Sequence, residues 1–178
     1  MGGNAMEASF EKAAVPTVEI VQRLNAWEND PLLVPLTRPN KDREALERHE
    51  EVTSESLAKR LENHAVYLIR LGGTLVGEMN YQVDPDHLYK KEKDTAWIGI
   101  TIGEAAARGR GLGAIALDFL EAEIRHAGLH RIELGVFEFN LNAISLYTRL
   151  GYAEIGRLDA FTYYDGRMWQ DIRMEKYL

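Results

Sequence analysis

The chain contains no cysteine, which excludes disulfides, thiolate catalysis and zinc sites built from cysteine ligands. It has no apolar run near the roughly 18–20 residues that a membrane-spanning helix requires. Its N-terminus lacks the apolar segment of a secretory signal peptide. Together these absences predict a cytoplasmic protein that does not partner a membrane.

Positive charge is also scarce. The chain has 21 Lys and Arg against 28 Asp and Glu, for a net charge of −7. This balance argues against a nucleic-acid partner and favours a cationic one, although an acidic surface also serves solubility. With 178 residues and 46% hydrophobic content, the chain can bury a substantial core. We expect one domain over residues 7–178, preceded by an added or disordered N-terminal extension over residues 1–5.

The hydrophobic period switches between about 3.6 and 2 along the chain, which predicts a mixed α+β order with one crossover helix. Residues around Phe10 are a candidate first strand, and residues 31–42, with three prolines, are expected to form a loop. The predicted helices cover residues 16–29, 54–63, 112–127 and 143–150. The predicted strands cover residues 65–71, 74–81, 95–102, 131–137, 153–164 and 167–177. In the third helix, the spacing of Leu112, Ile115, Ala116, Phe119 and Leu120 predicts a face toward the core.

A glycine-rich turn, residues 108–113, lies between the strand at 95–102 and the helix that starts at Leu112. Free backbone N–H groups at a helix N-terminus attract anions, and glycines allow close approach. Arg108 and Arg110 add positive charge, so the turn predicts a phosphate or pyrophosphate site. A purely structural turn is the alternative.

The turn resembles one nucleotide-binding motif and lacks the defining residues of another. Gly109-x-Gly111-x-x-Ala114 matches a loose dinucleotide fingerprint, with Glu133 at a suitable distance for a ribose hydroxyl. A dinucleotide fold needs several successive βαβ units, whereas this sequence predicts one. The phosphate loop of nucleotide hydrolases is excluded, because no Gly-Lys-Ser/Thr follows.

Two motifs resemble the GNAT superfamily of N-acyltransferases. Arg108-x-x-Gly111-x-Gly113 is similar to its acyl-CoA-binding signature. The segment 140–152 contains Asn-x-x-Ala-x-x-x-Tyr and ends in Leu-Gly-Tyr, as a second motif of the superfamily does. The run at 156–161 and the closing hairpin resemble the branch that acetylates ribosomal-protein N-termini and spermidine.

The resemblance implies the GNAT fold, a twisted, mixed but mostly antiparallel sheet flanked by helices, with splayed strands in the middle. It also implies acetyl-CoA as co-substrate. The turn would hold the pyrophosphate, and the end of the strand at 95–102 would pair with the pantetheine arm. The expected cofactor-binding residues are Ile100, Thr101, Ile102, Arg108, Gly109, Arg110, Gly111, Leu112, Gly113, Asn140 and Ala143.

Tyr147 is the predicted general acid, since a phenol can protonate a leaving thiolate at neutral pH. Its alternative is a core residue in a packing stripe of the short helix. Asn140 would orient the pantetheine or a water, cap the following helix, or do both.

The general base is less defined. Many relatives carry glutamate where this chain has Trp97. Glu78 is our predicted catalytic base and Glu133 the second candidate, although each also suits a salt-bridged strand position. Ordered water is a further route for the proton.

No metal site is predicted, because His126 and His130 flank Gly128, where the helix is expected to end, and are interpreted as surface residues. The expected activity is acetyl transfer to a primary amine by direct attack, with a polyamine, a small cationic amine or a protein N-terminus as acceptor. The alternative is a non-catalytic acyl-CoA sensor or interaction module. A homodimer through the C-terminal hairpin is a further expectation.

Overall fold

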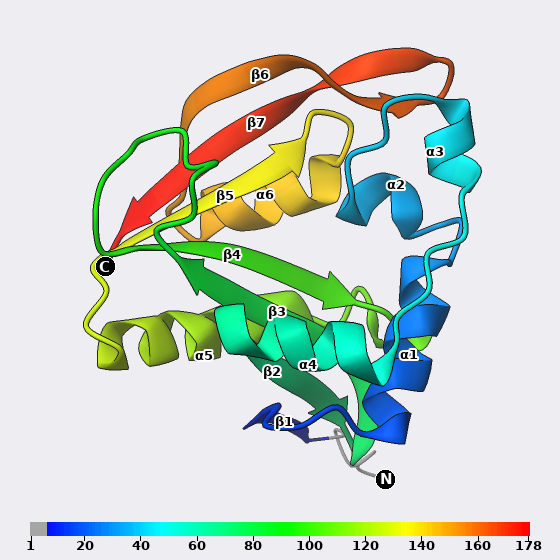
Figure 1. Cartoon of the computed structure of the whole chain (residues 1–178). Helices are drawn as coiled ribbons and strands as arrows, with labels where there is room; N and C mark the ends of the chain where they lie inside the picture. The colour runs from blue at the N-terminus through cyan, green and yellow to red at the C-terminus, as the bar shows by residue number, and fades with distance from the viewer. Residues whose placement is uncertain (1–6) are drawn as a thin grey trace, which may run out of the picture.

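The computed structural model describes residues 7–178, and the predicted extension at residues 1–5 lies outside them. All strands of the described residues form one seven-stranded sheet in the order β1-β2-β3-β4-β5-β7-β6 (Figure 1). The strands are β1 Ala8–Lys12, β2 Ala65–Leu71, β3 Thr74–Val83, β4 Thr95–Ile102, β5 Arg131–Phe137, β6 Ala153–Tyr164 and β7 Arg167–Tyr177. The helices are α1 Val18–Glu28, α2 Val34–Thr37, α3 Arg43–Glu47, α4 Ser54–Asn63, α5 Leu112–His126 and α6 Leu141–Arg149.

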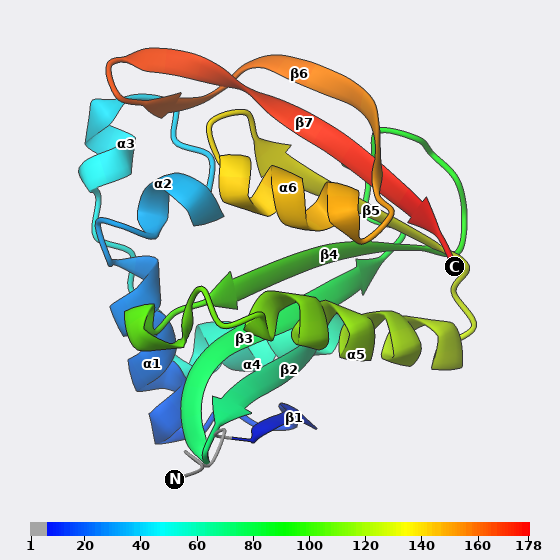
Figure 2. The same ribbon diagram turned by 180° about the vertical axis from the view of Figure 1, so that it is seen from behind.

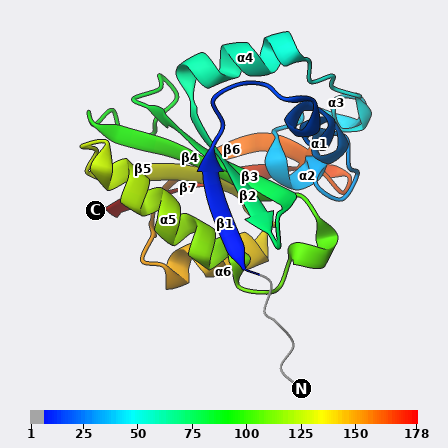
Figure 3. The same ribbon diagram turned by 90° about the horizontal axis from the view of Figure 1, so that it is seen from below.

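The sheet is mostly antiparallel, with one parallel pair between β4 and β5. This arrangement confirms the predicted fold class. Helices α5 and α6 cover one face, and α1 and α4 cover the other (Figures 2 and 3). None of the helices within residues 7–178 has the length and apolar character needed to cross a membrane.

Strands β4 and β5 separate soon after they meet. Their register contains only Thr95–Arg131, Ala96–Ile132 and Trp97–Glu133. Beyond these pairs, β4 pairs only with β3 and β5 only with β7. The predicted splay in the middle of the sheet is therefore confirmed, and it leaves one backbone edge of residues 98–102 unpaired.

The main core lies between the sheet and α5. The helix buries a stripe that includes Leu112, Ala116, Leu117, Leu120 and Ile124. Phe119 is half-buried, and its ring stacks on Phe10 at a centroid distance of 4.9 Å. Ile115, in contrast, is 54% exposed, so its predicted place on the core face is wrong. It lies at the edge of the buried stripe, close to the start of the helix.

The N-terminal third departs from the prediction in one segment. Residues 31–42 are not all loop, because α2 forms a single turn that contains Pro35 near its start, where proline costs no helical hydrogen bond. Helix α3, which the period did not predict, is capped by Asp42 through a hydrogen bond from the N–H of Ala45. The strand predicted around Phe10 is confirmed as β1.

Trp27 joins the N-terminal helices to the end of β4. Its ring packs against Gly103, where a Cβ would overlap the indole, and its Nε1 donates to Glu104 at 3.0 Å. The α1 side of the molecule is thereby fixed next to the segment that leads into the glycine-rich turn.

Candidate active site

The glycine-rich turn forms the start of α5 as predicted. Gly109 and Gly111 have φ values of +70° and +75°, a conformation that favours glycine, and Gly111 is the N-cap of the helix. A 3-10 turn, Ala105–Ala107, precedes them. The first N–H groups of α5 have no carbonyl partner within the helix, so they are available to an anion.

The two arginines of the turn differ in their contacts. Arg108 is half-buried and donates to the carbonyls of Ile102 and Gly103 at 2.9 and 2.7 Å. It therefore fastens the turn to the end of β4. Arg110 is exposed, and it forms no ion pair or side-chain hydrogen bond within residues 7–178. Its charge is free to meet an anion at the helix N-terminus.

The other predicted cofactor residues lie on the unpaired part of β4, at the start of α5 or at the start of α6. Ile100, Thr101 and Ile102 are half-buried on the unpaired part of β4. Gly113 allows α6 to approach, since a Cβ there would lie 3.2 Å from Leu146. The start of α5 thus lies against the second turn of α6.

Asn140 is the N-cap of α6, which confirms one of the two roles predicted for it, the capping of the following helix. Its Oδ1 accepts the N–H of Ala143 at 3.3 Å, which satisfies one free donor of the first turn. Ala143 itself is half-buried. The contact of either residue with pantetheine stays a prediction.

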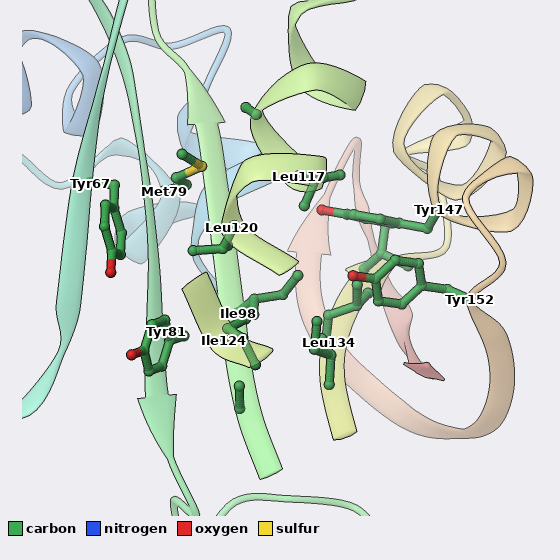
Figure 4. Close-up of a cluster of buried hydrophobic side chains, with 14 of the residues drawn as sticks. Tyr67, Met79, Tyr81, Ile98, Leu117, Leu120, Ile124, Leu134, Tyr147 and Tyr152 are labelled. Atoms are coloured by element: carbon green, nitrogen blue, oxygen red, sulfur yellow. The ribbon is translucent and has the colours of Figure 1, made fainter. Parts of the chain in front are cut away.

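Tyr147 lies in the core between α5 and α6. It is 8% exposed, and its ring meets that of Tyr152 edge to face at 5.6 Å. Figure 4 shows its hydroxyl directed toward Leu117 of α5. Within the described residues this hydroxyl has no hydrogen-bond partner, and burial raises the pKa of Tyr147 to about 12.

The two predicted base candidates are both ion-paired. Glu78 is 7% exposed and accepts from Arg60 of α4 at 2.9 Å. Glu133 is fully buried, accepts from Arg131 at 2.7 Å, and also binds the backbone N–H groups of Tyr89 and Lys90. Glu133 therefore anchors the β3–β4 loop to the sheet.

Sequence reasoning missed a polar cluster on the last strand. Asp171 and Arg173 are 2% and 4% exposed, and Arg173 Nε donates to Asp171 Oδ2 at 2.7 Å. The available signal was the alternation of charged and apolar residues in β7, where Ile172 and Met174 enter the core between them. That alternation places the charged residues on the face opposite Tyr147.

Two histidines, His126 and His130, were predicted to lie on the surface. His126 and His130 are both exposed, and each lies near a glutamate. Within residues 7–178, no cluster of three histidine or carboxylate side chains suits a metal ion.

Comparison with known proteins identifies the family. The model of the Acetyltransferase (GNAT) family matches residues 22–152, most of the chain. The chain belongs to the GNAT family of acetyltransferases. The match includes the glycine-rich turn, the separated strands and α6, so the site lies within the family domain.

Relatives and solved structures agree with this assignment. A spermine/spermidine N(1)-acetyltransferase of Bacillus subtilis is 35% identical over 91 residues. The match covers 49% of this chain and 58% of that relative, so the chain spans little more than half its length.

Solved structures share the fold over nearly the whole chain. A ribosomal-protein-alanine N-acetyltransferase from Brucella melitensis superposes with a TM-score of 0.75 at 23% identity, covering 96% of this chain and 99% of that one. A spermidine N-acetyltransferase from Vibrio cholerae, solved with CoA and spermine, gives 0.73 at 16% identity over 96% and 95%. At these identities the likeness concerns the fold alone.

Proposed function

We propose that this GNAT protein moves the acetyl group of acetyl-CoA to a primary amine by direct attack of the amine on the thioester. The observation that carries the proposal is the separation of β4 and β5 beside the glycine-rich start of α5. An unpaired strand edge suits the amides of a pantetheine arm, and a helix N-terminus suits a pyrophosphate.

The cofactor contacts follow from this arrangement. The N–H groups of residues 109–113 and the charge of Arg110 hold the pyrophosphate, while Arg108 keeps the turn against β4. Backbone groups of residues 100–102 pair with pantetheine and face the thioester carbonyl, where fixed donors stabilise a developing oxyanion. Asn140 and Ala143 position the arm from the start of α6.

Tyr147 supplies the proton for the departing thiolate. Its position at the α6 side of the separated strands and its raised pKa, about 12, support this role, because the phenol stays protonated at neutral pH. The absence of cysteine supports direct attack, since no thiol is present to carry the acetyl group.

The acceptor we propose is a polyamine or another cationic amine, with a protein N-terminus as a second class. The net charge of −7 and the likeness to a spermine/spermidine acetyltransferase support a cationic acceptor. A cytoplasmic location and a homodimer through the β6–β7 hairpin stay predictions.

The test is CoA release from acetyl-CoA, followed with a thiol reagent across polyamines, aminoglycosides, amino acids and short peptides. The protein adds no thiol background, because it has no cysteine. We expect release that depends on the added amine, fastest with polyamines. Acetyl-CoA binding without release for any amine would favour the sensor alternative.

A further inference from the structure

Two glycines flank the point where β4 and β5 separate, and each lies under a polar side chain. Gly99 and Gly135 follow the last pair, Trp97–Glu133, by two residues. A Cβ on Gly99 would lie 3.1 Å from Asn80 Nδ2, and one on Gly135 would lie 2.6 Å from Asp171 Oδ2. An amide and a carboxylate thus lie over the two strands that border the separation.

Asp171 is held rigidly in this position. Arg173 donates to its Oδ2 at 2.7 Å and also to the carbonyl of His87 at 2.9 Å. The guanidinium of Arg173 lies 4.8 Å from the centre of the Trp97 ring. Asp171 Oδ1 accepts no hydrogen bond from residues 7–178, so one carboxylate oxygen remains uncommitted.

The other two carboxylates near the separation are differently placed. Glu133 receives hydrogen bonds on both oxygens from Arg131 and from the β3–β4 loop. Glu78 of β3 accepts from Arg60 of α4 at 2.9 Å, and Asn80 Nδ2 donates to both of its oxygens at 3.4 Å. Of the three, Asp171 alone keeps an oxygen that accepts no hydrogen bond from residues 7–178.

The base that we consider, Asp171, and the acid, Tyr147, lie on opposite faces of the sheet. Asp171 pairs across from Phe137 on one face, whereas its neighbour Ile172 enters the core with Tyr147 on the other. An amine that attacks from the Asp171 side therefore meets a base, and the thiolate leaves toward an acid.

We propose that Asp171 accepts the proton that the acceptor ammonium must lose before its nitrogen attacks, an inference that rests on the proposed acetyl transfer. The proton passes to Oδ1, the nitrogen lone pair bonds to the acetyl carbon, and the carbon–sulfur bond breaks with its electrons on sulfur. Tyr147 protonates the thiolate and becomes a phenolate. The nitrogen, which still carries one proton more than the amide product keeps, gives that proton to the phenolate and restores Tyr147. One ammonium and one thioester give one amide, one thiol and one proton released from Asp171 to solvent.

Burial raises the pKa of Asp171, and the adjacent Arg173 opposes the rise. Glu133, 3.8 Å from Arg173, and the His87 ring against Trp97 are the other titratable groups at this cluster. A carboxylate must be ionised to act as a base, so this step is present above the pKa of Asp171 and lost as the pH falls through it.

The test compares Asp171→Asn with Asp118→Asn, a matched change at an exposed carboxylate of α5. Each is assayed with spermidine, which is protonated at neutral pH, and with aniline, which is neutral. We expect Asp171→Asn to lower kcat/KM for spermidine by about 10²–10⁴-fold and to affect aniline far less. Acetyl-CoA affinity should stay close to that of the control, whereas the thermal midpoint should fall, because the change leaves the buried guanidinium of Arg173 with less compensation.

The pH profile separates a base from a structural residue. With spermidine, the wild type should hold a constant kcat/KM at neutral pH, whereas Asp171→Asn should rise about tenfold per pH unit, because only neutral amine then reacts. A wild-type profile that itself rises in this way overturns the proposal, even if Asp171→Asn does not fold.

The experiment also separates failure of the proposed acetyl transfer from failure of the role of Asp171. No amine-dependent CoA release by the wild type refutes the proposed acetyl transfer itself. An active wild type with an equally active Asp171→Asn variant refutes only the role of Asp171. If Glu78→Gln shows the expected pattern and Asp171→Asn does not, Glu78 is the base and the proposal is overturned.

Discussion

Replacing Tyr147 with phenylalanine removes one buried oxygen and leaves the rest of the ring. The hydroxyl has no hydrogen-bond partner among the described residues, and the edge-to-face contact with Tyr152 at 5.6 Å does not need it. No buried polar group loses a partner, so the free energy of unfolding at neutral pH should change by less than about 1 kcal/mol.

Turnover should respond quite differently. Loss of a positioned general acid costs about 10²–10⁴-fold in rate, so we expect kcat to fall within this range. Acetyl-CoA affinity should be preserved, because the backbone of residues 109–113 and Arg110 are unchanged. The assay is steady-state CoA release at saturating amine, combined with calorimetric titration of acetyl-CoA.

Alkaline stability gives an independent check of the tyrosine's environment. Burial raises the pKa of Tyr147 from 10.0 to about 12, so the folded state favours the neutral phenol. This contribution is fully present below pH 10 and is lost as the pH rises through 12, by up to about 3 kcal/mol. Tyr147→Phe should lose less stability than the wild type over that window.

The matched control is Tyr177→Phe, which removes a hydroxyl from an exposed tyrosine at the end of β7. It should change neither turnover nor acetyl-CoA affinity. Wild-type turnover in Tyr147→Phe would refute the acid assignment. A parallel fall in acetyl-CoA affinity and thermal midpoint would show that Tyr147 serves packing instead.

Two further predictions concern charges. Arg110→Ala should weaken acetyl-CoA binding by about tenfold without changing the thermal midpoint. Arg108→Ala should weaken binding and also destabilise the fold by about 1–3 kcal/mol, because the carbonyls of Ile102 and Gly103 lose their donor. Titration calorimetry and thermal denaturation separate the two, and equal effects of both variants would contradict the distinction. Glu133→Gln should cost about 3 kcal/mol in urea denaturation, since it leaves buried Arg131 with less compensation; an unchanged midpoint would contradict a structural role for Glu133.

Much of the fold followed from local sequence signals. The strands predicted at 153–164 and 167–177 leave Asp165-Gly166 between them, a pair that suits a type I′ hairpin turn because this turn needs positive φ at both residues. The structure has φ values of +48° and +79° there. The glycine-rich turn and its helix likewise depend on residues close in sequence. The short helices α2 and α3 were not predicted, because four or five residues give no usable period.

The site was only partly predictable, because several of its contacts join residues that are far apart in the sequence. Arg108 was expected to face the cofactor, and nothing local shows that it bonds the carbonyls of Ile102 and Gly103. The position of Asp171 over Gly135 joins residues on different strands, whose register the sequence does not state. The contacts of such side chains could be found only from the structure.

The most direct test of the account is to identify the product. Wild-type protein, acetyl-CoA and spermidine are incubated together, and CoA and spermidine species are followed by mass spectrometry. We predict that acetylated spermidine and free CoA appear in equal amounts, and that Tyr147→Phe slows both alike. CoA that accumulates without an acetylated amine, or no release with acetyl-CoA bound, would contradict acetyl transfer to amines.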